Sequence, residues 1–423
     1  MAGERGKTIA LDGNNLAYWV PLDEKGTLFP NAHEGIYRLS EWIKEGNFES
    51  IQLFVHGWRN TPTYACNMYQ SWFNERIAAA PQQQAKRVLR LCVSWPSTVT
   101  GQTWEEYVRG STSSPPDDSD EFFKVIAAGS TDPEKCEAAV ACSDYETIAR
   151  LSLRFDESFN EVVGELKEPI DLSASFRWVK KEGDKKYGLQ GVSDDSDDAN
   201  KFRDYMSFQK MKQRAARIAS SKGFQAFFSE LVDSKIPVDV MGHSFGCKFA
   251  LAAVNEAPKS TRIRSLVLMQ PAVSRWCLSP DLRSMWDLRI FSHGVGMYHT
   301  VPTKLQKPLI VFFSTNDVAL VQLYPIATFV TGDRYGAVLV SRDDGPRSRT
   351  DYAALGAYGP DIDDPKMPGV ADTELIDAEK SLADADKLNI LGIRGDWDHG
   401  WEPDKKGWCR LDVAKVVSLV QSE

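Results

Sequence analysis

Residues 239–254 read DVMGHSFGCKFALAAV, and Ser244 stands in this stretch between Gly242 and Gly246. The apolar residues before Ser244 are typical of a buried strand, and those after it have the pattern of a helix. A strand that enters a helix through Gly-x-Ser-x-Gly holds the serine on a sharp, strained turn with its Oγ exposed above the sheet. A β-carbon at either glycine would collide with the neighbouring strand and helix. We therefore expect Ser244 to be a nucleophile, and the alternative is an ordinary turn serine.

The rest of the chain alternates short apolar runs with helical patterns, as in a mostly parallel sheet covered by helices on both faces. The predicted strands are 7–12, 50–57, 88–95, 237–244, 265–272, 308–315 and 388–395. The predicted helices are 34–45, 62–78, 204–233, 246–256 and 411–421. We assign 1–97 and 204–423 to an α/β core. Residues 98–203 are expected to be an insertion that forms a cap or lid, and 321–386 a second surface excursion.

Composition and charge limit the partners. The 423 residues carry a formal net charge of -9, whereas nucleic-acid binding relies on basic patches, so we expect no nucleic-acid partner. The chain starts without a signal peptide, and no stretch approaches the roughly 18 apolar residues of a membrane helix. Seven scattered cysteines favour reduced thiols over a disulfide scaffold or a zinc site. We expect a cytoplasmic protein with no metal or cofactor, although signal-independent secretion would leave the same sequence.

A serine nucleophile needs a base, and the base needs an orienting acid. Where the serine lies on such a turn, the acid and then the histidine follow it along the chain. His399 is the sole histidine in the last 120 residues and follows the last predicted strand, so it is the expected base. Asp317 follows the strand 308–315 and is the expected acid, with capping of the next helix as the alternative. Asp396 and Asp398 are rivals that we expect to shape the loop of His399.

An oxyanion would be stabilised by two backbone N–H groups. One is expected from Phe245, directly after the nucleophile. The other is expected from Trp58, in the His-Gly turn of LFVHGWRN (53–60). We expect His56 of that turn to be structural, and His243 to take part in packing.

Four tryptophans occur near these segments: Trp58, Trp95, Trp276 and Trp397. They suggest an apolar or acyl-bearing substrate, with Trp95, Trp276 and Trp397 as candidate substrate-binding residues. The competing interpretation of each ring is ordinary core packing.

The motifs LFVHGW, VSWPS, GHSFG, STND and DHGW follow one another in this order. Together they resemble the α/β-hydrolase superfamily of serine esterases, lipases and related acyl hydrolases, over roughly residues 50–97 and 204–420. The sequence VHG followed by SWPS is also similar to a bacterial branch of that superfamily with no assigned function. The resemblance implies an eight-stranded, mostly parallel sheet and a triad of Ser244, Asp317 and His399. The insertion at 98–203 departs from the family pattern.

These observations lead us to expect a serine hydrolase that cleaves small-molecule or lipid carboxylic esters through an acyl-enzyme. An acyltransferase, amidase or thioesterase would use the same site. A non-catalytic hydrolase-fold protein that binds a ligand or partner is the alternative from another class, and an intact triad counts against it. The sequence does not decide acyl-chain length or oligomeric state.

Overall fold

The computed structural model describes most of the core and part of the insertion. The described residues are 6–80, 87–111, 119–152, 162–164, 195–258, 263–280, 294–324, 328, 353–360, 369–383, 388–402, 404 and 406–421.

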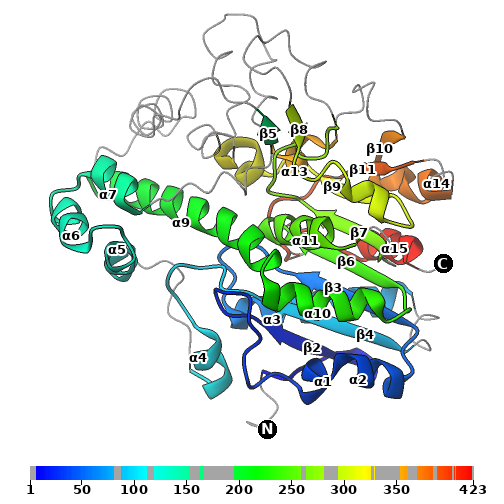
Figure 1. Cartoon of the computed structure of the whole chain (residues 1–423). Coiled ribbons are helices and arrows are strands. Elements are labelled where there is room, and N and C mark those ends of the chain that lie inside the picture. Colours follow the sequence, from blue (N-terminus) through cyan, green and yellow to red (C-terminus); the bar gives the residue numbers. More distant parts are fainter. Residues whose placement is uncertain are drawn as a thin grey trace, which may run out of the picture.

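Nine strands of the described residues form one sheet in the order β1-β2-β4-β3-β6-β7-β9-β11-β10 (Figure 1). Their bounds in chain order are β1 Thr8–Ala10, β2 Leu16–Pro21, β3 Ser50–Val55, β4 Val88–Ser94, β6 Val238–His243, β7 Ile263–Met269, β9 Leu309–Phe313, β10 Val370–Glu374 and β11 Ile390–Arg394. Neighbouring strands are parallel throughout except for β1 and β2, which are antiparallel. The chain therefore has the predicted α/β class and mostly parallel sheet.

The sheet differs from the sequence prediction at two strands. Six of the seven predicted strands contain an observed one, and the seventh, predicted at 265–272, overlaps β7, which begins two residues earlier at Ile263. Strands β2 and β10 were not predicted, and the sheet has nine strands where the resemblance implied eight. Strand β10 reads VADTE and is exposed or half-buried throughout, because it lies at the edge of the sheet. A polar edge strand has no buried face to produce an apolar pattern, so its sequence gives little signal.

Helices cover both faces of the sheet (Figure 1). Their bounds are α1 Glu34–Tyr37, α2 Leu39–Gly46, α3 Pro62–Ala79, α4 Trp104–Arg109, α5 Ser119–Ala128, α6 Pro133–Ala141, α7 Tyr145–Ser152, α9 Asp195–Ala219, α10 Lys222–Asp233, α11 Phe245–Glu256, α13 Leu355–Tyr358, α14 Ala378–Ala383 and α15 Leu411–Val420. One apolar core joins the sheet to α2, α9, α10 and α11, and a second joins it to α3, α4 and α15. The central strands are buried on both faces because helices pack on each side.

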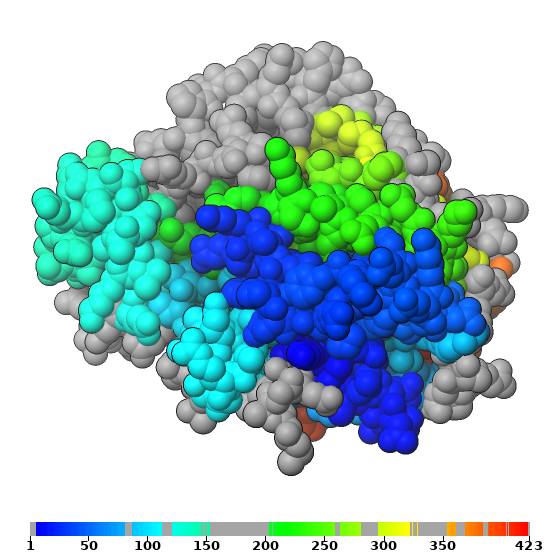
Figure 2. All heavy atoms as spheres, turned by 60° about the horizontal axis from the view of Figure 1, so that its bottom comes forward, coloured from blue at the N-terminus to red at the C-terminus, as the bar shows by residue number. Residues whose placement is uncertain are grey.

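The described part of the insertion 98–203 is mostly helical. Helices α5, α6 and α7 pack on one another, and α5 also contacts α9, the long helix that leads back into the core. In Figure 1 this group lies at the end of α9, and Figure 2 shows it as a lobe at the left of the molecule. A short strand, β5 (Val162–Gly164), pairs antiparallel with β8 (Gly294–Gly296). The role of the insertion as a cap stays a prediction.

Two further expectations concern the cysteines and the membrane. All seven cysteines are free, and five of them are buried. Within the described ranges, no helix is long and apolar enough to cross a bilayer.

Candidate active site

Ser244 lies on a strained turn between β6 and α11. Its backbone has φ 54° and ψ -121°, a region that residues other than glycine rarely adopt. A β-carbon on Gly242 would lie 2.4 Å from the carbonyl oxygen of Gly246, and one on Gly246 would lie 2.2 Å from that of Val55 in β3. The two glycines therefore permit the close contact of turn, strand and helix that the sequence pattern predicted.

Hydrogen bonds hold the strained backbone in place. The Ser244 N–H donates to the Met269 carbonyl at 3.0 Å. The Ser244 carbonyl accepts from the N–H groups of Cys247 and Ala272, at 3.0 and 3.3 Å. Helix α11 starts at the next residue, Phe245, so the positive end of its dipole lies beside the Ser244 side chain.

The structure brings His399 and Asp317 to Ser244. The Nε2 atom of His399 is 3.0 Å from the Ser244 Oγ, and its Nδ1 atom is 2.7 Å from Oδ2 of Asp317. A carboxylate oxygen can only accept, so Nδ1 is the protonated nitrogen, and in the neutral ring Nε2 is left to accept the serine proton. The three side chains form the continuous chain of hydrogen bonds that was expected from their positions in the sequence.

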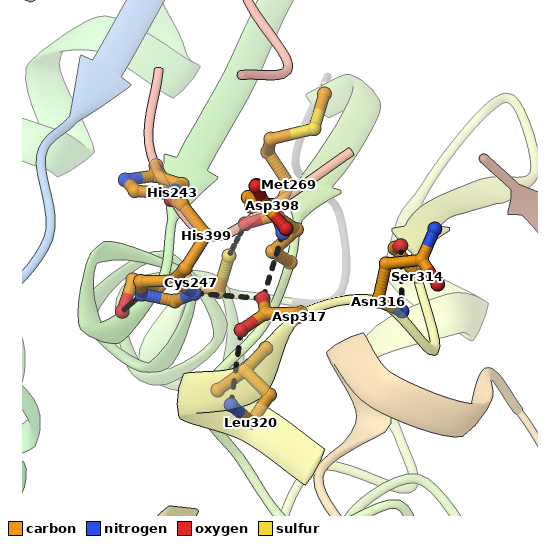
Figure 3. Close-up of polar contacts among 11 residues, drawn as sticks. His243, Cys247, Met269, Ser314, Asn316, Asp317, Leu320, Asp398 and His399 are labelled. Atoms are coloured by element: carbon orange, nitrogen blue, oxygen red, sulfur yellow. Dashed lines mark hydrogen bonds and ion pairs between the residues drawn. The ribbon is translucent and has the colours of Figure 1, made fainter. Parts of the chain in front are cut away.

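Asp317 makes both contacts that the two interpretations require, one to the imidazole and one to the following turn. Figure 3 shows the carboxylate between His399 and Leu320, with a dashed contact to each. Its Oδ2 accepts from His399, while its Oδ1 accepts the N–H of Leu320 at 3.0 Å and so caps the following turn. The side chain has no exposed surface. Capping thus holds one oxygen, Oδ1, of the carboxylate that faces the imidazole.

Asp317 changes the pKa of His399. Burial lowers the pKa of His399, but the carboxylate of Asp317 and its hydrogen bond outweigh burial and raise the pKa above 6.5. The His399 side chain remains 29% exposed, whereas Ser244 is only 5% exposed. The imidazole is therefore the most accessible member of the three.

Gln270 also contacts Asp317, and sequence reasoning missed it. Its Nε2 donates to Asp317 Oδ2 at 2.7 Å and to the Asp398 carbonyl at 2.9 Å. Gln270 directly follows β7 and is fully buried. No motif marks this residue, because its partners are distant in the sequence.

The rivals Asp396 and Asp398 do shape the loop of His399. The Asp396 carboxylate pairs with Arg410 at 2.8 Å, and the Asp398 N–H donates to the carbonyl of Lys406 at 2.9 Å. Among the described residues, neither carboxylate contacts the imidazole. These contacts tie both ends of the loop together, and within the described ranges Asp317 is the carboxylate that contacts the imidazole.

His243 packs against this loop, as expected. Its ring lies 5.2 Å from that of His399 and 5.0 Å from that of Trp408. Its Nε2 lies 3.1 Å from the His399 carbonyl oxygen, to which it donates, and burial lowers the pKa of His243 well below 6.5. The ring therefore stays neutral and supports the backbone of His399.

The expected oxyanion donors flank Ser244. A β-carbon on Gly57 would lie 2.8 Å from the Ser244 Cβ, so the turn that carries Trp58 lies directly against the serine. Among the described residues, neither the Trp58 nor the Phe245 backbone N–H has an acceptor. Both N–H groups are thus unpaired within the described part of the chain, and their role toward a ligand on Ser244 stays a prediction.

His56 is structural, as expected, and holds this turn. Its Nδ1 donates to the Gly57 carbonyl at 2.9 Å, and its ring stacks on Trp95 with centroids 5.7 Å apart. The Trp95 indole in turn donates to the His56 carbonyl at 2.8 Å. Burial lowers the pKa of His56 to about 4, so the ring is neutral near pH 7.

The remaining tryptophans pack mainly against protein. Trp397 is fully buried and contacts Phe312, with centroids 5.9 Å apart, and Trp95 is 2% exposed. Trp276 is 6% exposed and lies under the guanidinium of Arg275. The rings of Trp95 and Trp397 have core positions, and substrate contact by any of the three stays a prediction.

In the part of the chain that the structure describes, no group of three or more His, Cys, Asp or Glu side chains is placed to hold a metal ion. Comparisons with protein-family models, with curated proteins and with solved structures found no match to this chain.

Proposed function

We propose that the chain is a serine hydrolase of the α/β-hydrolase fold that cleaves carboxylic esters. The observation that carries the proposal is the hydrogen-bonded sequence from Ser244 Oγ to His399 to Asp317, with the serine on a strained strand-to-helix turn. A binding protein has no need of a strained serine backed by a histidine and a buried carboxylate.

The first half of the reaction forms an acyl-enzyme. Ser244 Oγ attacks the ester carbonyl carbon while Nε2 of His399 takes the hydroxyl proton. Asp317 stabilises the resulting imidazolium through Nδ1. The tetrahedral intermediate then collapses, the carbon–oxygen bond to the leaving alkoxide breaks, and His399 returns the proton to the departing alcohol.

The second half releases the acid. Water attacks the acyl carbon as His399 again accepts a proton, and the intermediate expels Ser244 with that proton returned to Oγ. In both halves the negative oxygen is stabilised by the N–H groups of Trp58 and Phe245 and by the start of α11. Removal of one such donor costs about 3 kcal/mol in a well-studied serine hydrolase, so this contribution is substantial but smaller than that of a triad member.

The test is turnover of p-nitrophenyl esters with acyl chains of increasing length, with the first turnover followed by stopped flow. We expect a burst of p-nitrophenolate equal to the concentration of enzyme, followed by slower steady release, if deacylation limits turnover. The chain-length dependence would define the size of the acyl pocket.

The matched control is Ser244→Ala, which removes the Oγ and leaves the backbone turn unchanged. We expect this variant to lose turnover by several orders of magnitude at unchanged thermal stability. Wild-type turnover that equals that of Ser244→Ala, in folded protein, would refute the proposed function.

A further inference from the structure

Gln270 lies between the two segments that carry the acid and the base. Asp317 is on the turn after β9, and His399 is on the loop after β11. The Gln270 backbone N–H donates to the Phe312 carbonyl at 2.9 Å and so joins Gln270 to β9. Its side chain then reaches both segments, with one amide N–H on Asp317 Oδ2 and one on the Asp398 carbonyl.

The orientation of the amide is fixed by its partners. A carboxylate and a backbone carbonyl are both acceptors, so the NH₂ group must face them. In this orientation the Gln270 Oε1 is buried and has no hydrogen-bond partner among the described residues. The residue also has φ 46°. An unpaired buried oxygen and a left-handed backbone both oppose folding, which indicates that this position serves something other than stability.

His243 makes a parallel contact on the same loop. Its Nε2 donates to the carbonyl of His399, directly after the carbonyl that Gln270 holds. Two consecutive carbonyls of the base loop are therefore bound by side chains that come from the ends of β6 and β7. These contacts anchor the partly exposed imidazole to the rigid centre of the sheet.

We propose that Gln270 is a positioning residue that sets the relation of the Asp317 carboxylate to the His399 imidazole. It fixes one carboxylate oxygen and the backbone next to the base with a single planar amide. This inference rests on the proposed function, because it assigns a role in the same triad.

The test compares Gln270→Met with wild type, because methionine has a similar shape and no N–H donor. The measurements are the second-order rate of Ser244 phosphonylation by a fluorophosphonate, its pH profile, and the melting temperature. We expect the rate to fall 10- to 100-fold. We also expect the acidic limb of the profile to move to lower pH, because a carboxylate held through Oδ1 alone faces the imidazole less well and raises the pKa of His399 less against burial. His243 is the other titratable ring against His399 and is unchanged in the variant.

Gln225→Leu is the matched control. The Gln225 amide also donates to backbone carbonyls, those of Ala219 at 2.6 Å and Ala253 at 3.5 Å, but it does not contact the triad. We expect this variant to have a lower melting temperature than wild type and to keep the wild-type phosphonylation rate and pH profile. Gln270→Met should show the opposite pattern.

The outcomes separate the two proposals. An unlabelled wild type would refute the proposed function itself. A labelled wild type with a Gln270→Met variant that reacts at the same rate, with the same acidic limb, would overturn the role of Gln270 alone. Failure of Gln270→Met to fold would also overturn it, because the residue would then serve the fold.

Discussion

His399 Nε2 lies 3.0 Å from Ser244 Oγ although the two residues are 155 positions apart in the chain. The sheet produces this proximity, because β6 and β11 run parallel and end at the same edge, separated by β7 and β9. Ligands of open α/β sheets bind at the carboxyl ends of their strands, where these two side chains meet.

The strain at Ser244 leads to a prediction that separates activity from stability. Glycine tolerates φ 54° better than serine, so Ser244→Gly should lose turnover by several orders of magnitude and gain about 1 kcal/mol in the free energy of unfolding. Ser244→Ala should lose turnover equally without that gain, because alanine keeps the β-carbon. Urea unfolding of both variants measures the difference, and equal stabilities would show that the turn is unstrained.

The contact between Asp317 and His399 predicts the effect of an isosteric change. Asp317→Asn should lower kcat by about 10⁴-fold, because an amide favours the wrong tautomer of the imidazole. Asp396→Asn and Asp398→Asn should lower it far less, since the Asp396 carboxylate pairs with Arg410. Steady-state kinetics on an active ester make the comparison. A near-normal Asp317→Asn would place the acid elsewhere.

The pKa of His399 sets the pH dependence. The base must be neutral to accept the serine proton, and Asp317 raises its pKa above 6.5, so kcat/KM should fall with decreasing pH along a limb centred above 6.5. The free energy of unfolding depends on pH in the opposite direction. The ion pair between protonated His399 and Asp317 stabilises the fold fully below pH 6.5, and this stabilisation is lost as pH rises through the folded pKa. A profile of kcat/KM from pH 5 to 9 locates the limb, and a midpoint below 6.5 would contradict the assignment.

The buried His56 is expected to make the free energy of unfolding depend on pH in the acidic range. Its pKa is about 4 when folded and near 6.5 when unfolded, so its contribution to stability is lost as pH falls through that window. His56→Gln does not titrate there. The difference in unfolding free energy between wild type and His56→Gln should therefore change by about 3 kcal/mol between pH 6.5 and pH 4. Parallel stability curves would show that His56 is solvated.

The sequence predicted the parts of the site that depend on local pattern. The strand, glycines and helix around Ser244 are contiguous, so the turn was readable from fewer than 20 residues. His399 was selected because few histidines compete for the role of base, and Asp317 was selected because it follows a buried strand; the structure brings both side chains to Ser244. Each of these three residues could therefore be selected from its position along the chain.

Gln270 had no such signal. Its two partners, Asp317 and Asp398, are 47 and 128 residues away, and only the packing of β7, β9 and β11 brings them to one amide. Strand β10 was missed for a related reason. An edge strand forms by pairing with its neighbour and needs no apolar face, so its own sequence shows no apolar pattern. Both features depend on contacts between distant segments, which a local pattern does not record.

The most direct test of the central claim is the mass of the intact protein after reaction with a fluorophosphonate, followed by peptide mapping. We expect one phosphonyl group per chain, located on Ser244, and none on His399→Ala over the same time. A folded wild type that gains no mass, or gains it at another residue, would contradict the claim that His399 and Asp317 activate Ser244.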